Sequence, residues 1–463
     1  MIRLFDSVHG EVRDLDLRDP GRVAMYVCGP TVDNLPHLGH GRFTLVWDVA
    51  RRWFTFQGLE VRFVSNITDI DDKIIARAQQ EGRTTPEVVV EYEGRWWDAM
   101  SAIGVAAPDD SPHATAFVAE MIELISSFLA SDVAYPTSDG VYFDVSRVAD
   151  YGLLAGQPLE SLRAGARVEA HDEKRSPLDF VLWKNAKPGE PSWAAPFGDG
   201  RPGWHTECVV MSLGLLGEGF DLHCGGFDLK FPHHENERAQ AVAAGREFAR
   251  HWAHNGWVMV GGEKMSKSLG NFTSLTDLLA RTDPRAYRLL VLRSHYRSPI
   301  EVTPLTIADA ERALARLDRF ARRFALPVLA GDRLEVAAHH PWPGEALDLY
   351  ARVASNMDDD LDTPLALAQL FEALATANSA ADRGDDGTAR ELAAAVNVLF
   401  AAMGLALCAR DDEADSKSAE LVARRDAARA ARDWAEADRL RDELVTLGWV
   451  VEDSASGTLI RRP

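Results

Sequence analysis

The sequence predicts an α/β protein in which a parallel sheet covered by helices comes first, followed by an all-helical region and a small α+β module. Three observations predict this class. Strand and helix patterns alternate near the N-terminus, Ala, Leu and Arg recur at helical spacing from about residue 305, and short strand patterns return near the C-terminus. With 463 residues, the chain can form about three domains that each bury a core.

The parallel sheet is predicted from a strand-helix-strand unit at the start of the chain. Residues 22–28 and 59–66 have the composition of strands, and residues 41–57 between them have that of a helix. Strands joined in this way lie parallel, and ligands of such sheets bind where the strands end. Cys28 comes at the end of the first strand, so we expect it at the ligand-binding edge.

Later segments extend or follow this first domain. The Pro- and Gly-rich residues 186–203 indicate a loop and strand-like residues resume at 255–261, so residues of about 100–200 should form an insertion within one fold. The acidic, Ser-containing residues 410–418 have linker composition, and a helix with short strands at 447–452 and 457–461 follows them. The predicted units are 1–305 with the insertion, 306–409, the linker 410–418 and 419–463.

Composition and charge exclude several classes of protein. The chain is 46% hydrophobic and 26% charged, and it has neither an apolar run that could span a bilayer nor a basic and apolar leader, so we expect a cytoplasmic protein without membrane contact. The formal net charge of −21 repels polyanions, and we expect no DNA binding. Another nucleic-acid partner would need local basic faces, which residues 307–324 (five Arg against three acids) and 421–441 (six Arg against four acids) provide.

The four cysteines are too few for a disulfide framework, which leaves metal ligands, reactive thiols or core residues. They are Cys28, Cys208, Cys224 and Cys408. Cys408 ends an apolar helical stretch, so we expect it in the core.

His37-Leu38-Gly39-His40 lies between the first predicted strand and the helix. Gly39 allows close approach of a phosphate, a helix N-terminus favours negative charge, and the two imidazoles can donate to phosphate oxygens. On its own, the pattern is equally compatible with a surface turn whose histidines have no function.

A second motif, Lys264-Met265-Ser266-Lys267-Ser268, follows a Gly-Gly turn at 261–262. Two lysines on a loop are suited to neutralising the charge that develops on phosphates during group transfer. If it stood alone, the motif would be interpreted as a solvated basic loop.

In this order, and more than two hundred residues apart, the two motifs resemble the signatures of class I aminoacyl-tRNA synthetases. Further segments resemble the cysteinyl-tRNA synthetase family in particular, and the resemblance runs nearly end to end, including residues 433–438. These segments are 25–31, 66–73, 203–208 and 231–237.

The resemblance implies a Rossmann-like catalytic domain that ligates L-cysteine to tRNA(Cys), with ATP, through a cysteinyl-adenylate. It implies that His37 and His40 stabilise the α-phosphate of ATP, and that Lys264 and Lys267 stabilise the β- and γ-phosphates together with Mg²⁺. Residues 306–409 are expected to bind the tRNA stem and 419–463 the anticodon. Further ATP contacts are expected at Gly39, Met265, Ser266 and Ser268, and cysteine contacts at Gly29, Thr31, Thr68, Trp204 and His223.

A zinc site is expected from the residues and from the resemblance. His233 and Glu237 are four residues apart, so on a helix they project from one face, and Cys28 and Cys208 can complete a set of zinc ligands. Taken singly, each of these residue types is more commonly a buried thiol or a core histidine than a ligand. By resemblance, the four positions correspond to the family's zinc ligands. A cysteine thiolate binds zinc far better than a serine hydroxyl does, so one zinc ion per chain would select cysteine without a proofreading domain.

Two alternatives stay open. A cysteine ligase that acts on a small amino-sugar, as in the mycothiol pathway, would share both phosphate motifs and the zinc site but would not need residues 416–463. A non-catalytic RNA-binding relative would not need intact His37, His40, Lys264 and Lys267.

The chain departs from the family pattern at two positions. Asp33 stands where a tyrosine is usual, which leaves the contacts on the ATP side less defined. Cys224 stands where a glycine is usual, and we interpret it as a small buried residue and not as a zinc ligand.

Overall fold

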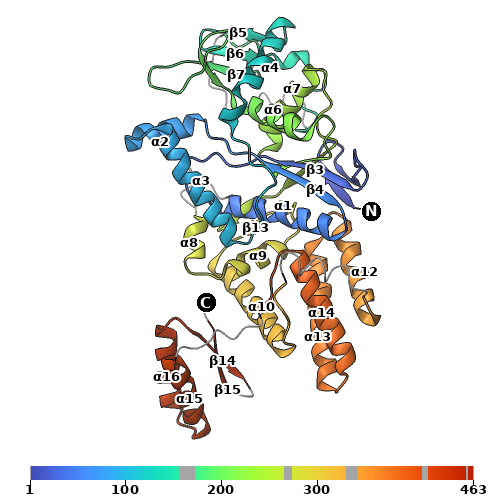
Figure 1. Cartoon of the computed structure of the whole chain (residues 1–463), viewed down its shortest axis with the longest axis vertical. Coiled ribbons are helices and arrows are strands. Elements are labelled where there is room, and N and C mark those ends of the chain that lie inside the picture. The colour runs from blue at the N-terminus through green and yellow to red at the C-terminus, as the bar shows by residue number, and fades with distance from the viewer. Residues whose placement is uncertain are drawn as a thin grey trace.

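The structure is a computed structural model that describes residues 2–156, 173–264, 274–329, 342–408, 416–454 and 457–461. Its parts follow one another along the long axis of the molecule (Figure 1). The segment inserted between the two halves of the central sheet lies at one end, the central sheet lies next to it, and the C-terminal helices lie at the other end. No helix of the described residues is long and apolar enough to cross a membrane.

The central sheet has four parallel strands in the order β10-β9-β3-β4. The strands are β3 (Arg22–Val27), β4 (Glu60–Ser65), β9 (Leu222–Gly226) and β10 (His251–Asn255). The helix α1 (Leu38–Phe56) connects β3 to β4 and buries one face against the sheet. The predicted strand-helix-strand unit is therefore confirmed, with the helix starting three residues early because His37 caps it.

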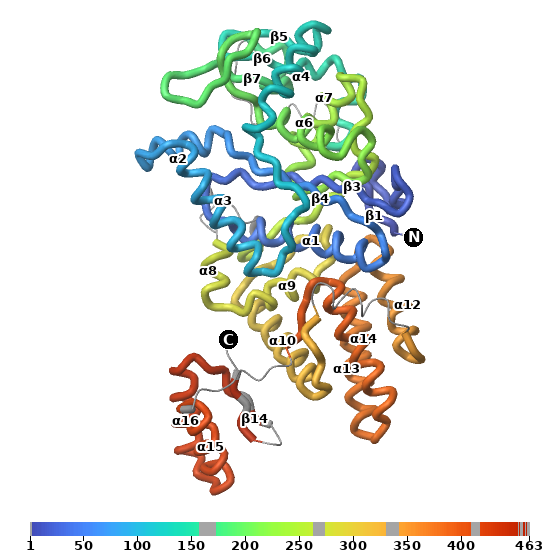
Figure 2. The backbone as a smooth tube through the Cα atoms, in the orientation of Figure 1, coloured from blue at the N-terminus to red at the C-terminus, as the bar shows by residue number. Residues whose placement is uncertain are grey.

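A separate antiparallel sheet is inserted between β4 and β9 (Figure 2). Helix α4 precedes it and helix α6 leads from it back to the central sheet. The predicted loop 186–203 is wrong at its end, because residues 200–202 pair with the preceding strand. The elements are α4 (Val118–Ala130), β5 (Ala134–Pro136), β6 (Gly140–Phe143), β7 (Phe180–Asn185), β8 (Gly200–Pro202) and α6 (Trp204–Leu216).

Shorter elements surround the central sheet. A hairpin of β1 (Arg3–Asp6) and β2 (Glu11–Asp14) begins the chain, and β11 (Val258–Val260) pairs with both β12 (Glu263–Lys264) and β13 (Ile300–Glu301). The strand predicted at 255–261 is thus two strands that break at Gly256. The remaining helices are α2 (Asp72–Glu81), α3 (Thr85–Ala102), α7 (Glu235–Ala243), α8 (Leu275–Leu279) and α9 (Pro284–Leu292), with short turns at Ala114–Phe117, Val145–Arg147 and Lys230–His234.

The helical region predicted from residue 305 is confirmed. Its core is continuous with the core under the sheet, because residues of α1, α9 and the last helix of the region belong to one buried cluster. Cys408 is only partly buried, since it lies just after that helix and donates its backbone N–H to Asp318. The helices are α10 (Pro304–Arg323), α12 (Gly344–Asp358), α13 (Thr363–Asp382) and α14 (Asp386–Ala402).

The C-terminal module contains two helices and a hairpin around a small core of its own. The sequence predicts one helix, but the chain turns at Arg432, which has a φ of +59°, and Asp433 then caps a second helix. Residues 416–418 of the predicted linker are helical, and the rest of that linker lies outside the described residues. The elements are α15 (Ser416–Ala430), α16 (Trp434–Thr446), β14 (Val450–Ser454) and β15 (Gly457–Arg461).

Candidate active site

A cavity of about 400 Å³ opens where the parallel strands end. Cys28 and Gly29 line it after β3, Gly226 lines it at the end of β9, and Asn255 at the end of β10. Residues from the first turn of α1, including His37, line it as well. A cavity therefore lies at the carboxyl edge of the sheet, where the sequence predicts ligand binding.

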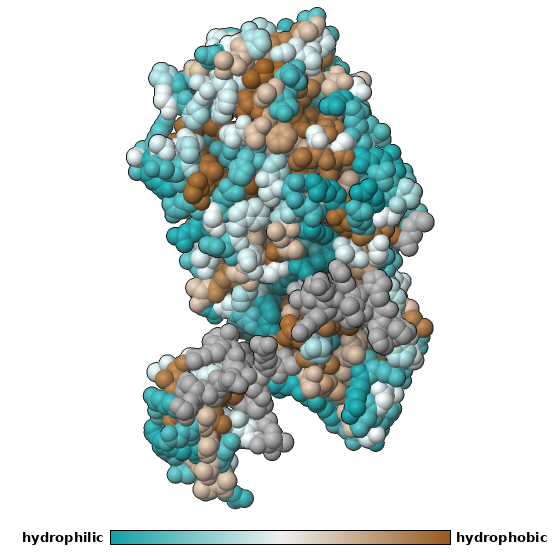
Figure 3. Space-filling view, in the orientation of Figure 1, coloured by the Kyte–Doolittle hydropathy of each residue, from teal (hydrophilic) through white to brown (hydrophobic). Residues whose placement is uncertain are grey.

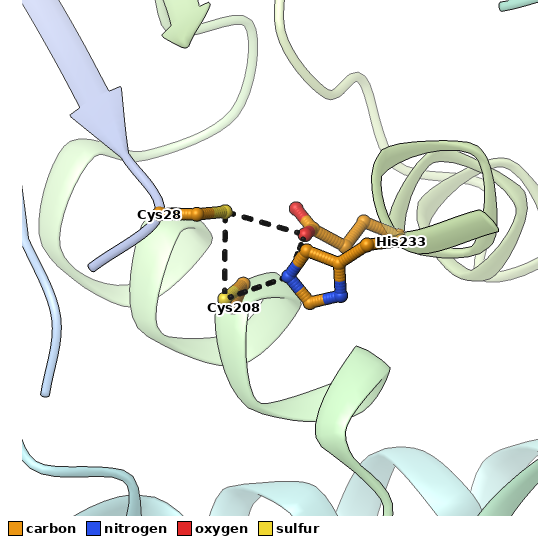
Figure 4. A group of neighbouring side chains, drawn as sticks. Cys28, Cys208 and His233 are labelled. Atoms are coloured by element: carbon orange, nitrogen blue, oxygen red, sulfur yellow. Dashed lines mark hydrogen bonds and ion pairs between the residues drawn. The ribbon is translucent and has the colours of Figure 1, made fainter. Parts of the chain in front are cut away.

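Cys28, which lines this cavity, meets Cys208, His233 and Glu237 beside it (Figure 4). The two sulfur atoms are 3.7 Å apart, and Cys208 Sγ is 3.6 Å from His233 Nε2. Glu237 Oε1 lies 3.5 Å from Cys28 Sγ and 2.8 Å from His233 Nε2. All four side chains are buried.

The three separations that involve a sulfur atom fit a tetrahedral zinc ion, whereas the 2.8 Å between His233 Nε2 and Glu237 Oε1 is the length of a hydrogen bond. With Zn–S distances of about 2.3 Å and Zn–N and Zn–O distances of about 2.0 Å, neighbouring ligand atoms lie about 3.3–3.8 Å apart. The buried thiols would ionise more readily beside a cation. Burial opposes the ionisation of both thiols and raises the pKa of Cys28 well above its usual value. At Cys208, hydrogen bonds to Cys28 and His233 outweigh burial and lower the pKa to about 6. A divalent cation would neutralise the thiolates and the carboxylate at this point.

Neighbouring side chains hold these four residues in place. His233 Nδ1 lies 2.9 Å from His205 Nδ1, which leaves Nε2 directed at Cys208 and Glu237. The Trp204 ring stacks on the His233 ring with centroids 3.8 Å apart. His223 Nε2 lies 2.6 Å from the second oxygen of Glu237. Such partners fix the orientation of metal-binding groups.

Gly29, Thr31 and Thr68 lie together beside the ends of β3 and β4. Thr31 and Thr68 form a parallel bridge, and the Gly29 backbone N–H donates to Asn66 Oδ1 at 2.9 Å. A Cβ atom at Gly29 would come within 1.6 Å of the Asn66 carbonyl oxygen, so only glycine fits. Gly29 and Thr31 line the cavity with Trp204, whereas Thr68 is buried and donates to Glu207.

His37 and His40 form a reciprocal cap on the first turn of α1. His37 Nδ1 accepts from the His40 backbone N–H at 3.1 Å, His40 Nδ1 accepts from the His37 backbone N–H at 3.3 Å, and the rings stack with centroids 3.5 Å apart. Since both Nδ1 atoms are acceptors, the proton of each neutral ring sits on Nε2. Both histidines and Gly39 line the cavity, so this helix start is suited to binding phosphate.

The second motif is described only at its first residue. Lys264 is the last residue of β12 and pairs with Met259 of β11. Strand β11 begins at Val258, which lines the cavity. Met265, Ser266, Lys267 and Ser268 lie outside the described residues.

Sequence reasoning missed several buried polar residues behind the predicted ligands. Glu207 lies on α6, and burial raises the pKa of its carboxyl well above the usual value. His234 Nδ1 contacts His254 Nε2 at 2.9 Å, and His254 Nδ1 contacts Ser7 Oγ at 2.7 Å. Glu207 and His234 lie within 203–208 and 231–237, two of the segments that resemble the family, and this is the signal that could have found them.

Cys224 and Asp33, the two departures from the family pattern, differ in position. Cys224 lies on β9 in the core beneath the sheet. Among the described residues, two groups of side chains could hold a metal ion, and Cys224 belongs to neither. They are the group above and a second one of Cys28, His223, His234 and Glu237. Asp33 lines the cavity, and its backbone carbonyl accepts from Arg77 Nε at 3.0 Å.

Comparison with known proteins identifies the family. Residues 15–312 match the model of the class I (C) tRNA synthetase catalytic domain. The whole chain is 44% identical to cysteine-tRNA ligase from Chromobacterium violaceum and 43% identical to that from Halorhodospira halophila, and each comparison covers 100% of both chains. The chain belongs to the cysteine-tRNA ligase family.

Two further segments match family models. Residues 352–407 match a DALR domain, and residues 411–461 match the cysteinyl-tRNA ligase anticodon binding domain. Solved class I synthetases share the fold at low sequence identity. Methionyl-tRNA synthetase from Mycobacterium tuberculosis has a TM-score of 0.59 at 16% identity, over 82% of this chain and 89% of that one. Leucyl-tRNA synthetase from Agrobacterium radiobacter has a TM-score of 0.61 at 11% identity, over 85% of each.

Proposed function

We propose that this protein joins L-cysteine to tRNA(Cys) in two steps. A carboxylate oxygen of cysteine attacks the α-phosphorus of ATP, and pyrophosphate leaves to give cysteinyl-adenylate. A ribose hydroxyl of the terminal adenosine of the tRNA then attacks the carbonyl carbon, and AMP leaves. The observation that carries the proposal is the group of two thiols, an imidazole and a carboxylate, whose member Cys28 lines the same cavity as His37 and His40.

Selection of cysteine is assigned to the buried group. Cys28, Cys208, His233 and Glu237 would hold one Zn²⁺, which when bound supplies a site for the substrate thiolate that serine cannot fill. The rest of the amino acid would be enclosed by residues near this metal site, namely Gly29, Thr31, Thr68, Trp204 and His223. Trp204, whose ring is about one third exposed, would shield the thiolate from water.

Phosphate chemistry is assigned to the start of α1 and to the second motif. The Nε2–H groups of His37 and His40 would donate to the α-phosphate, where charge builds up as pyrophosphate leaves. Lys264 and Lys267 would neutralise the β- and γ-phosphates together with Mg²⁺. Gly39, Met265, Ser266 and Ser268 would complete the ATP contacts.

Binding of tRNA(Cys) is assigned to the helical region 306–409 and to the module 419–463, and the match of residues 411–461 to the cysteinyl-tRNA ligase anticodon binding domain supports the second assignment. Most of the basic side chains that the sequence offers in the module pair with acids inside it. Arg424, Arg425, Arg429 and Arg439 form ion pairs with Glu436, Asp453 or Glu443. Among the described residues, Arg432 and Arg441 form no such pair, so they are the better candidates for RNA contacts. We place the protein in the cytoplasm, because the proposed reaction supplies charged tRNA for protein synthesis.

The amino-sugar ligase is the less favoured alternative. The full-length match to cysteine-tRNA ligases and the anticodon-binding match at residues 411–461 favour a tRNA acceptor. A purified sample should show ATP-pyrophosphate exchange with cysteine and not with serine, and should then charge tRNA(Cys). Exchange without charging of any tRNA would favour the amino-sugar acceptor, and absence of exchange would exclude both ligases.

A further inference from the structure

Arg42 is a buried cation on α1, close in sequence to the histidines that cap this helix. It lies on α1, two residues after His40, and its exposed fraction is 1%. Its guanidinium donates to three backbone carbonyls: Nη1 to Trp257 at 2.5 Å, and Nη2 to Tyr296 at 3.1 Å and to Ser298. Among the described residues no carboxylate forms an ion pair with it. Arg42 therefore binds backbone alone.

The three carbonyls belong to the wall of the cavity and to the segment that supports it. Trp257 lines the cavity with its neighbours in the segment 255–258, while Tyr296 and Ser298 precede β13. The two segments are also joined directly, because the Gly256 N–H donates to Tyr296 at 2.8 Å and the Ile300 N–H donates to Trp257 at 2.9 Å. Past Trp257 the wall continues as β11 and β12, which end at Lys264.

The backbones approach each other most closely at Gly256. A Cβ atom there would lie 2.5 Å from the Arg297 carbonyl oxygen and 2.6 Å from that of Ser298. The Ser298 oxygen is held by Arg42, so it cannot move far. The position of the cavity wall relative to α1 is thus fixed by a tight contact between two backbones and one guanidinium.

We propose that Arg42 is a positioning residue for ATP, which holds the cavity wall 255–258 and the strand leading to Lys264 in register with His37 and His40. It does so without touching substrate, because Arg42 does not line the cavity. This inference rests on the proposed function, since that function assigns the cavity to ATP.

Arginine suits this place for a geometric reason. Its planar fork of donors reaches carbonyls of two separate segments at once, whereas lysine concentrates its donors on one nitrogen. Burial lowers the pKa of Arg42 to about 10, so the group stays charged at neutral pH. Loss of the fork would leave the Ser298 carbonyl without this donor and would remove one of the two donors of the Trp257 and Tyr296 carbonyls, so the wall would shift.

The test is the effect of Arg42→Lys on ATP-pyrophosphate exchange, with ATP and cysteine varied separately. We expect kcat/KM for ATP to fall about 10²-fold while KM for cysteine stays within about twofold, because a displacement of about 1 Å is enough for such a loss and the thiol site lies on other elements. Unchanged ATP kinetics in a folded Arg42→Lys protein would overturn the proposal.

Arg288→Lys is the matched control. Arg288 is equally buried and also donates to three carbonyls, those of Ile103, Gly104 and Met403. It differs from Arg42 in that it pairs with the Asp48 carboxylate and lies away from the cavity. We expect Arg288→Lys to lower Tm without changing the balance between ATP and cysteine. An equal loss for ATP in both variants would mean that any damage to the core has this effect, and would overturn the proposal.

If the Arg42 variants do not fold, Gly256→Ala tests whether the position of the cavity wall affects ATP. Its added methyl points at the Arg297 and Ser298 carbonyls, so it strains the same contact from the other side. We expect the same selective loss for ATP, and normal ATP kinetics in Gly256→Ala would contradict the proposal. A wild-type protein without cysteine-dependent exchange would instead refute the proposed function, so the two failures are distinguishable.

Discussion

At the scale of single residues, the zinc assignment is open to a direct test. Cys208 is one of two thiols in the proposed metal site, and a serine hydroxyl is a poor substitute for a thiolate. Cys208→Ser should therefore lose both the metal and the activation of cysteine. The measurement is metal analysis by mass spectrometry of the purified protein, together with pyrophosphate exchange.

Cys224→Ala is the control for this variant. Cys224 is as buried as Cys208 but lies in the core beneath the sheet, so its zinc content should stay at about one ion per chain. Full zinc content in Cys208→Ser, or loss of zinc in Cys224→Ala, would contradict the ligand set.

His37 has two roles that substitution can separate. Its Nδ1 caps α1, and its Nε2–H is assigned to the phosphate. Asparagine is a good helix cap but places no donor where the imidazole does, so His37→Asn should keep its thermal stability while the exchange rate falls about 10²–10³-fold. His37→Ala should in addition lose about 1 kcal/mol of stability. An active His37→Asn protein would leave the histidine with the capping role alone.

The residues of the candidate site that sequence reasoning found are those whose chemistry is rare. Two histidines around a glycine, or cysteines near a histidine and a glutamate, stand out against the background of the chain. Glu207, His234 and Arg42 do not stand out, because their roles depend on contacts with segments far away in the sequence. Those contacts, such as Arg42 with Ser298, exist only after folding.

At the scale of helices and strands, a buried ion pair joins α1 to α9. Asp48 lies on α1 with 3% exposure, and its carboxylate contacts Arg288 of α9 and Arg52, each at 2.8 Å. It also accepts from the Ala106 N–H. Burial opposes its ionisation, but the two arginines prevail and lower the pKa of Asp48 below its usual value.

Asp48→Asn should destabilise the protein by about 3–5 kcal/mol at pH 7, because it leaves Arg288 buried without its counter-charge. A group with a lowered pKa contributes stability above its unfolded pKa of about 3.9 and loses it as the pH falls through the folded value. The difference between wild type and variant should therefore shrink below about pH 4. Chemical denaturation at several pH values measures it.

The exposed pair of Arg22 and Glu60 is the control at this scale. Its atoms are 2.9 Å apart, but both side chains are more than half exposed. Glu60→Gln should cost no more than about 1 kcal/mol. Equal costs for the two substitutions would show that α1 and α9 do not depend on their buried pair.

Most elements were predictable from local pattern, and the errors have local causes too. β8 was missed because Gly200 and Pro202 resemble loop residues, yet strand β7 pairs with them. The second helix of the C-terminal module was missed because Arg432, a good helix former, adopts a left-handed conformation. At β8, pairing with β7 prevails over the local preference of the residues.

At the scale of the whole molecule, the C-terminal module has a core of its own and is set apart from the rest of the chain (Figure 3). A protein truncated after Asp415 should therefore fold, bind zinc and carry out cysteine-dependent exchange. Charging of tRNA(Cys) should fall steeply, since contacts with the anticodon are lost. Parallel exchange and charging assays measure this, and undiminished charging would refute the role of the module.

The salt dependence of tRNA binding gives a second measurement on the same pair of proteins. Each phosphate contact releases counterions, so affinity for tRNA should fall as salt rises, and less steeply for the truncated protein.

Arg441→Ala in the full chain should weaken tRNA binding more than Arg425→Ala does, provided both proteins fold, because Arg425 is already paired with Asp453. The reverse order would show that the paired arginines exchange partners when RNA binds.

The order of strands in the central sheet has a consequence for how the protein is made. Strand β3 pairs with β4 on one side and with β9 on the other, and β9 is synthesised about 160 residues after β4. At roughly 5–20 residues per second, the ribosome takes about 8–30 seconds to cover that distance. During this interval the nascent chain holds β3 with one edge open, although five of its six residues are destined for burial. The antiparallel sheet of the insertion, whose strands all emerge in that time, can fold before the central sheet that carries it.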